Sequence, residues 1–146
     1  VTYQLTTAFQ GVAHPLTASE SGVMLADSAE PDVSTQWLLT AHGDGLFRIM
    51  NASKGDKSSL TVDDTASDHT IQMSESVDDN SQLWRVQPLN NGYCRLTSKL
   101  LGTELSLDII NEATPRQLFM AASGNFSGQN WKLTTDSKQK QDPTLA

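Results

Sequence analysis

The tryptophans of this chain stand at equal intervals. Trp37, Trp84 and Trp131, the only three, are separated by 47 and again by 47 residues. The sequence around them recurs too: Ser-Gln-Leu-Trp-Arg-Val at 81–86 returns as Gly-Gln-Asn-Trp-Lys-Leu at 128–133 and weakly as Ser-Thr-Gln-Trp-Leu-Leu at 34–39. A fixed period of this length indicates a repeat architecture, which constrains the fold before any local propensity does. The chain is therefore predicted to be a threefold internal repeat.

Other landmarks keep the same register. The stretch 45–49 (Gly-Leu-Phe-Arg-Ile) recurs 47 residues later as Gly-Tyr-Cys-Arg-Leu at 92–96. We place the repeats at 1–44, 45–91 and 92–135, forming one domain over 1–135, and interpret the polar segment 136–146 as a tail or linker. Three sets of apolar residues are aligned between the repeats: Leu16, Leu60 and Leu105; Val23, Ile71 and Leu118; Leu25, Met73 and Met120.

Each repeat contains short β segments. In the second repeat, residues 46–50, 59–62, 70–73 and 83–86 are strand candidates, several with period-two alternation, and turn-forming clusters separate them. No window has a sustained helical apolar stripe. We expect an all-β protein of twelve strands with little helix.

Charge and composition exclude several classes of partner. The net charge of −7 argues against nucleic acid, whose phosphates require clustered Lys and Arg, and against an anionic membrane surface. No apolar run is long enough for a membrane span. The single cysteine, Cys94, occupies an apolar strand position and is expected to be a buried, inert thiol. A secreted or periplasmic location is our expectation.

Gln-x-Trp near the end of a threefold β repeat resembles the ricin-type β-trefoil lectins and related carbohydrate-binding modules. The motif is complete at Gln82–Trp84 and Gln129–Trp131, whereas repeat one has Thr35 in place of the glutamine. The resemblance implies a β-trefoil, in which a six-stranded barrel is capped by three hairpins. The tryptophans are expected to lie buried about a pseudo-threefold axis, and the glutamine amides to tie loop backbone together.

The resemblance also implies where sugar pockets would lie. In sugar-binding members each pocket uses an aspartate in the second strand, an aromatic platform in the third, and an amide near the motif. A ring stacks on an apolar sugar face while the carboxylate accepts hydroxyl hydrogen bonds. Our alignment places substitutes at all these positions: Thr17, Thr61 and Ser106 for the aspartate; Ala26, Ser74 and Ala121 for the ring; Ser34, Ser81 and Gly128 for the amide. Every pocket is therefore expected to have lost its carboxylate and its ring.

Repeat two nevertheless keeps the most polar side chains around its expected pocket. Asp63, Asp64, Gln72 and Asn80 are candidate carbohydrate-binding residues there, although turn chemistry explains the aspartates equally simply. A register shift of two residues would bring Asp63, and in repeat three Asp108, to the carboxylate position. Two phenylalanines in polar loops, Phe126 and Phe9, are candidate anchors for a glycan or a protein partner, or plugs of the barrel mouth.

The leading hypothesis is a non-catalytic, lectin-like carbohydrate-binding module, an accessory domain of a secreted polysaccharide-active protein. The rival hypothesis is a trefoil that has lost sugar binding and serves as a protein-interaction or scaffold domain. A fused catalytic domain is a further candidate partner. Catalysis within the chain is the weakest hypothesis, because His14, His42 and His69 lack metal-ligand spacing and no nucleophile or phosphate-loop motif occurs. We expect no catalytic residue, no metal and no cofactor.

Overall fold

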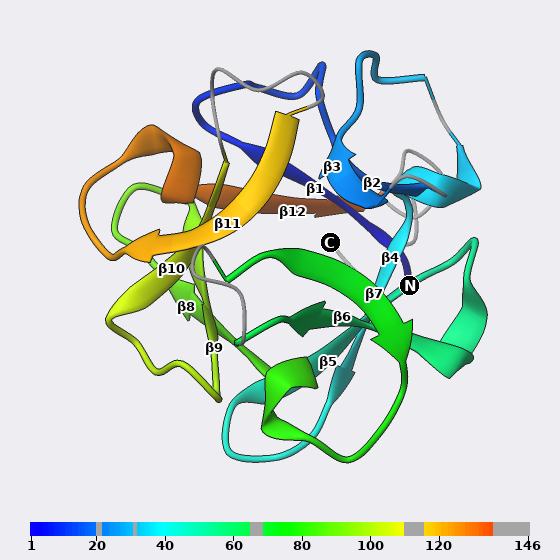
Figure 1. Cartoon of the computed structure of the whole chain (residues 1–146). Coiled ribbons are helices and arrows are strands. Elements are labelled where there is room, and N and C mark those ends of the chain that lie inside the picture. Colours follow the sequence, from blue (N-terminus) through cyan, green and yellow to red (C-terminus); the bar gives the residue numbers. More distant parts are fainter. Residues whose placement is uncertain (20–21, 31, 65–68, 110–115, 136–146) are drawn as a thin grey trace.

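The described residues form twelve short strands (Figure 1). The computed structural model describes residues 1–19, 22–30, 32–64, 69–109 and 116–135, so the predicted tail at 136–146 lies outside the described residues. The strands are β1 (Tyr3–Thr7), β2 (Leu16–Ser19), β3 (Gly22–Leu25), β4 (Trp37–Ala41), β5 (Leu46–Asn51), β6 (Ser58–Val62), β7 (Ile71–Glu75), β8 (Trp84–Pro88), β9 (Cys94–Ser98), β10 (Leu105–Ile109), β11 (Arg116–Ala122) and β12 (Trp131–Thr135).

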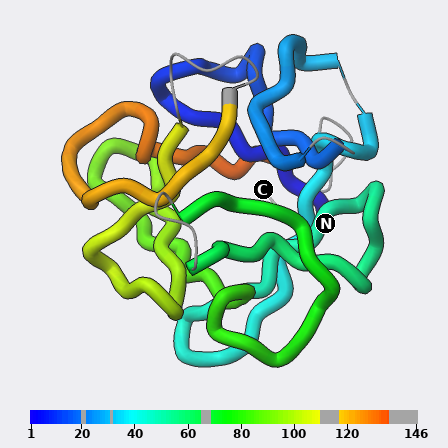
Figure 2. Tube along the Cα trace, in the orientation of Figure 1, coloured from blue at the N-terminus to red at the C-terminus, as the bar shows by residue number. Residues whose placement is uncertain are grey.

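Of the strands that the structure describes, six close into a barrel and six form hairpins. The barrel order is β1-β12-β9-β8-β5-β4, and the hairpins are β2–β3, β6–β7 and β10–β11. In the tube trace the three repeats form three lobes around a common centre (Figure 2). The predicted β-trefoil is confirmed, with one addition: β3 pairs with β11, so two of the hairpins join into a four-stranded sheet.

Helix is limited to single 3₁₀ turns in the described residues. The turns η1 (Val33–Thr35), η3 (Asn80–Gln82) and η4 (Ser127–Gln129) each end two residues before a tryptophan, and η2 (Gly55–Lys57) precedes β6. The expectation of little helix is confirmed. None of these helices is long and apolar enough to cross a membrane.

The three tryptophans occupy equivalent, fully buried positions. Each ring has 0% exposure, and its Nε1–H donates to a leucine carbonyl oxygen of the second strand of the same repeat. The three hydrogen bonds are Trp37 to Leu16 at 2.9 Å, Trp84 to Leu60 at 2.9 Å and Trp131 to Leu107 at 3.0 Å. These bonds satisfy the indole N–H in the core and fix which residues are equivalent between repeats.

That equivalence corrects our alignment of repeat three. We aligned Leu105 with Leu16 and Leu60, but the leucine bonded by Trp131 is Leu107, which pairs with Met120 just as Leu60 pairs with Met73. Leu105 lies two residues earlier in β10 and is only partly buried. The second-strand position of repeat three is therefore shifted by two residues along the chain.

The motif glutamines are buried hydrogen-bonding hubs. Gln82 donates through Nε2 to the carbonyl oxygen of Glu75 at 2.7 Å, and its Oε1 accepts from the backbone N–H of Val77 at 2.9 Å. Gln129 repeats this pattern with Ala122 at 2.9 Å and Gly124 at 3.0 Å. Both amides thus join the end of the third strand to the loop that follows it.

Cys94 is buried in β9 with 9% exposure. Burial raises the pKa of its thiol to about 11, because the thiolate would lose solvation. The thiol is therefore protonated at neutral pH and unsuited to nucleophilic chemistry.

Candidate functional site

The corrected register puts a carboxylate at the second-strand position of repeat three. Asp108 follows Leu107 as Thr17 follows Leu16 and Thr61 follows Leu60. Asp108 is half-buried in β10; its Oδ1 accepts from the backbone N–H of Ile109 at 2.7 Å and its Oδ2 from Gln129 Nε2 at 3.0 Å. These bonds orient the carboxylate and still leave acceptor capacity, since two oxygens offer about four lone-pair sites.

A glycine makes room for this carboxylate. A Cβ on Gly128 would lie 2.4 Å from Asp108 Oδ1 and 3.3 Å from Ile109 Cγ1. In repeat one the equivalent position is Ser34, whose Oγ accepts a 3.0 Å hydrogen bond from Thr17 Oγ1. Repeat one thus has a threonine and a serine where repeat three has an aspartate and a glycine, so the space of a serine side chain is given to the carboxylate.

Three aromatic residues lie near Asp108, one across the hairpin and two along an adjoining cavity. Phe119 of β11 pairs directly with Asp108 across the hairpin, and directly opposite residues project to the same face. Phe119 is partly exposed between Leu118 and Met120, which are buried. A cavity of about 260 Å³ adjoins Asp108 and is lined by Phe9, Asp108, Ile109, Phe126, Ser127 and Gly128.

The two cavity phenylalanines come from opposite ends of the chain. Phe126 precedes η4 and is 57% exposed, and Phe9 lies in the turn after β1 and is 45% exposed. The Phe9 backbone N–H donates to the carbonyl oxygen of Ser127 at 3.2 Å, and the preceding Ala8 N–H donates to that of Asn130 at 2.9 Å. These bonds fix the turn after β1 against the loop that carries Phe126.

The prediction that every pocket has lost its carboxylate is wrong for repeat three. Ser106, which we assigned to the carboxylate position, is fully buried, and its hydroxyl bonds to Ser123 Oγ at 2.6 Å. Asp108 stands at the position instead. Ala121 keeps the ring position, because it follows Met120 as Ala26 follows Leu25 and Ser74 follows Met73, and the aromatic residue of this hairpin is Phe119, directly opposite Asp108. In repeats one and two the carboxylate position holds Thr17 and Thr61, as the alignment placed them.

The candidates of repeat two lie near one another in the chain but line neither cavity. Asp63 and Asp64 follow β6, where the backbone N–H of Asp63 donates to the carbonyl oxygen of Thr70 at 2.9 Å. Gln72 is exposed on β7 opposite Thr61, and Asn80 is exposed at the start of η3. A glycan-binding role for these four residues stays a prediction.

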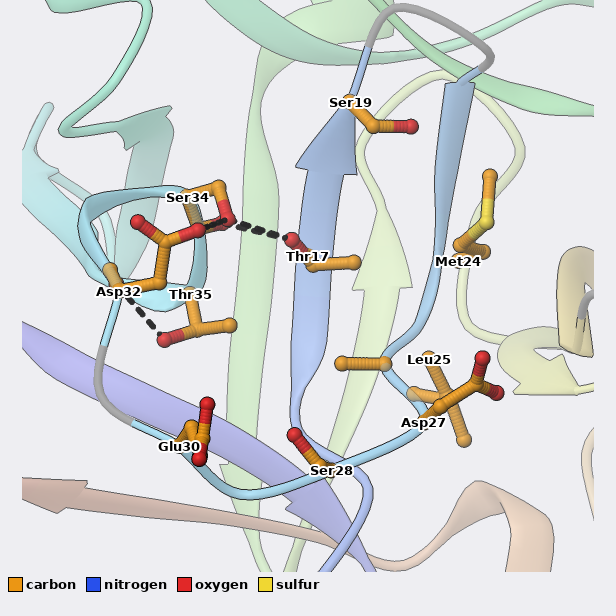
Figure 3. A pocket seen from close by; sticks show the side chains of 11 residues that line it. Thr17, Ser19, Met24, Leu25, Asp27, Ser28, Glu30, Asp32, Ser34 and Thr35 are labelled. Atoms are coloured by element: carbon orange, nitrogen blue, oxygen red, sulfur yellow. Dashed lines mark hydrogen bonds between the residues drawn. The ribbon is translucent and has the colours of Figure 1, made fainter.

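Repeat one contains a larger cavity, of about 480 Å³, between the β2–β3 hairpin and η1 (Figure 3). A chain of hydroxyls crosses one wall: Thr17 Oγ1 donates to Ser34 Oγ at 3.0 Å, which donates to Asp32 Oδ2 at 2.7 Å. Asp27 and Glu30 line the opposite end, and Met24 faces the cavity from β3. Thr17, Ala26 and Ser34, which the alignment placed at the carboxylate, ring and amide positions of repeat one, all line this cavity. Sequence reasoning missed only its acidic residues, which follow the hairpin in a loop that no motif marks.

The two cavities therefore differ in chemistry. The described lining of the repeat-one cavity offers hydroxyls and carboxylates without an aromatic ring, whereas the cavity beside Asp108 combines one carboxylate with two exposed rings. Within the described ranges, no group of three His, Cys, Asp or Glu side chains could hold a metal ion. A carboxylate beside aromatic faces can hold a polar molecule that also has an apolar face.

Comparison with known proteins supports the β-trefoil fold. The family model described as "Ricin-type beta-trefoil lectin domain-like" matches residues 33–118, which is more than half of the chain. No curated protein matches the sequence.

Solved structures share the fold at low sequence identity. The designed threefold-symmetric protein ThreeFoil superposes with a TM-score of 0.80 at 21% identity, covering 92% of this chain and 99% of that one. A Polyporus squamosus lectin bound to the epitope Neu5Acα2-6Galβ1-4GlcNAc gives 0.75 at 20% identity, with 90% and 48% coverage. An exo-β-1,3-galactanase from Clostridium thermocellum gives 0.79 at 20% identity, where 92% of this chain matches only 30% of the enzyme.

Proposed function

Because this chain belongs to the ricin-type β-trefoil lectin family, we propose that it is a non-catalytic carbohydrate-binding module whose glycan site lies in repeat three. The observation that carries the proposal is the position of Asp108. It stands at the second-strand site of its repeat, opposite Phe119 and beside a cavity lined by Phe126 and Phe9.

The chemistry of this site suits a sugar. A pyranose presents an apolar face of C–H groups and a rim of hydroxyls, so it can stack on a ring while its hydroxyls donate to a carboxylate. Asp108 is held in place by Gln129 and by its own strand before any ligand arrives. This preorganisation lowers the entropic cost of binding.

The expected affinity is weak. A single sugar unit buries little apolar area, so for one unit we expect a Kd near the millimolar end, which is about 4 kcal/mol of binding free energy. Useful retention on a polysaccharide then depends on repeated ligand units or on linkage to another binding or catalytic domain. We place the module accordingly as an accessory domain of a secreted or periplasmic polysaccharide-active protein, a role supported by the family and by the partial match to a galactanase.

Affinity electrophoresis tests the proposal. The domain is run in gels containing β-1,3-galactan, xylan or β-1,3-glucan, beside three variants. Asp108→Asn keeps the size of the side chain but removes its charge and replaces one acceptor oxygen by an NH2 donor, and is expected to abolish retardation. Asp78→Asn is the matched control, an exposed aspartate outside both cavities, and is expected to migrate like the wild type.

The third variant distinguishes a glycan site in repeat three from one in repeat two. Substitution of both Asp63 and Asp64 by Ala leaves retardation intact if repeat three is the site, and abolishes it if repeat two is the site. Retardation of Asp108→Asn equal to that of the wild type would contradict the proposed site. Absence of binding to these polysaccharides and to a broad glycan array would favour the protein-interaction scaffold instead.

A further inference from the structure

We infer that the repeat-three site takes a neutral glycan chain of at least two sugar units, which crosses from repeat three onto the first turn of repeat one. The inference rests on the proposed function and adds the class of ligand. Its basis is the pair of aromatic side chains, Phe126 and Phe9, that lie beyond the Asp108–Phe119 pair.

The exposed rings converge on one place. Among the described residues, the exposed large hydrophobic side chains are five aliphatic ones and two aromatic ones, and both aromatic ones line the cavity beside Asp108. Two rings left 57% and 45% exposed in one cavity present much apolar surface to water. Asp108 and Phe119 already provide a carboxylate and a ring for one sugar unit, so the other two rings offer contacts for a neighbouring unit.

The backbone that carries the two rings is fixed before a ligand arrives. The turn that carries Phe9 is bonded through two backbone N–H groups to residues 127 and 130, so repeat one and repeat three present a single surface here. Phe126 lies against Gly124, where an added Cβ would be 2.5 Å from the ring atom Cε2. A flexible loop would lose this geometry, whereas fixed aromatic anchors bind at low entropic cost.

Charge selects among glycans. Asp108 is the only charged residue among the described residues that line the cavity, and the chain as a whole carries a net charge of −7. An anionic polysaccharide would be repelled by both. A neutral chain instead offers hydroxyls to Asp108 and apolar sugar faces to the rings.

The experiment measures affinity against chain length. The mono- to tetrasaccharide series of β-1,3-galactan, xylan and β-1,3-glucan are titrated into the wild-type domain by calorimetry, with oligogalacturonides as anionic comparators. Phe9→Ala is compared with Val12→Ala, a matched control in the same β1–β2 loop that is 71% exposed and does not line the cavity. Thermal unfolding of each variant verifies that the fold is retained.

For one neutral series, we expect affinity to rise from the monosaccharide to the longer chains. Phe9→Ala is expected to weaken binding of the tetrasaccharide by about 2- to 12-fold, the contribution of one aromatic contact, and to leave the monosaccharide unchanged. Val12→Ala is expected to change neither.

Equal affinity for monosaccharide and tetrasaccharide, or unchanged tetrasaccharide binding in Phe9→Ala, would overturn this inference while leaving the proposed function intact. Tighter binding of the oligogalacturonides would overturn the assignment to a neutral glycan. Absence of binding by the wild type to every series would overturn the proposed function, and this inference with it.

Discussion

Truncation of Trp84 to alanine provides a quantitative test of the fold's core. The ring is fully buried and donates a 2.9 Å hydrogen bond to the carbonyl oxygen of Leu60. A tryptophan of this kind buries about 150–250 Å², which at ~25 cal/mol per Å² corresponds to about 4–6 kcal/mol. Measured truncations of large core aromatics cost about 3–5 kcal/mol, and we expect a loss in that range.

The assay is urea denaturation followed by far-UV circular dichroism. With a slope of about 2 kcal/mol per molar urea, the midpoint is expected to fall by about 2 M, which would leave a domain of ordinary stability mostly unfolded. Trp84→Phe keeps most of the ring but frees the Leu60 carbonyl, so its cost is expected to be about 1–3 kcal/mol. Phe126→Ala, which removes a ring that is 57% exposed, is the matched control and should shift the midpoint little.

The threefold symmetry supplies a second comparison. Trp37 and Trp131 have the same burial and the same hydrogen bond, so their alanine variants are expected to be destabilised to a similar degree. A cost below about 1 kcal/mol for Trp84→Ala, or a cost equal to that of Phe126→Ala, would refute the reasoning that these rings hold the core together.

Three further predictions follow from single residues. Gly128→Ala is expected to displace the Asp108 carboxylate and weaken glycan binding about 10-fold or more, measured by the same titrations. Gly128 does not adopt a left-handed backbone, so the effect comes from contact of the added Cβ with Asp108 and not from backbone strain. Cys94 is expected to resist alkylation by iodoacetamide until urea unfolds the protein. Because burial raises its pKa to about 11, Cys94 contributes stability that is fully present below the unfolded pKa of about 8.5 and is lost as the pH rises toward 11. A Cys94→Ala variant is expected to lack this pH dependence in urea denaturation. The pKa of Asp79 is lowered by hydrogen bonds from the backbone N–H of Ser81 and then from the Ser81 hydroxyl. The stability that Asp79 contributes is therefore present above about pH 3.9 and is lost as the pH falls through its folded pKa. In urea denaturation, Asp79→Ala should be less stable than the wild type at pH 7 and equally stable in acid.

The fold could be predicted because its repeat is marked by tryptophan, a large residue that is rare in this chain. Three tryptophans at a 47-residue period remain recognisable although most other residues differ from repeat to repeat, and each tryptophan occupies an equivalent buried position. The second strand of repeat three could not be placed as firmly. A slip of one residue would turn apolar side chains to the wrong face, but a slip of two keeps them on the same face.

Leu105 and Leu107 therefore both satisfy the alternation of β10, and the hydrophobic pattern cannot choose between them. A different signal could have done so. Eleven residues separate Leu5 from Leu16 and Ile49 from Leu60, and the same interval from Leu96 reaches Leu107. Applying this eleven-residue interval to Leu96 would have placed Leu107, and therefore Asp108 after it, at the second-strand position of repeat three.

The convergence of Phe9 with Phe126 depends on how the chain closes. The first strand pairs with the last, which brings the turn after β1 beside the loop before β12. Local sequence marks both rings only as residues in polar loops, and each was equally consistent with a plug of the barrel mouth. Their common cavity is a tertiary property that the periodicity of the repeats does not contain.

The most direct test of the account is a chemical-shift map of the ¹⁵N-labelled domain titrated with the tetrasaccharide of β-1,3-galactan, xylan or β-1,3-glucan that binds most tightly. The account predicts perturbed amides in three segments, 8–12, 107–109 and 124–130, which meet around Asp108. The amides of Asp63, Asp64, Gln72 and Asn80 are expected to remain unshifted. Perturbations centred on those four residues, or on the repeat-one cavity around Thr17, would contradict the assignment of the glycan site to repeat three.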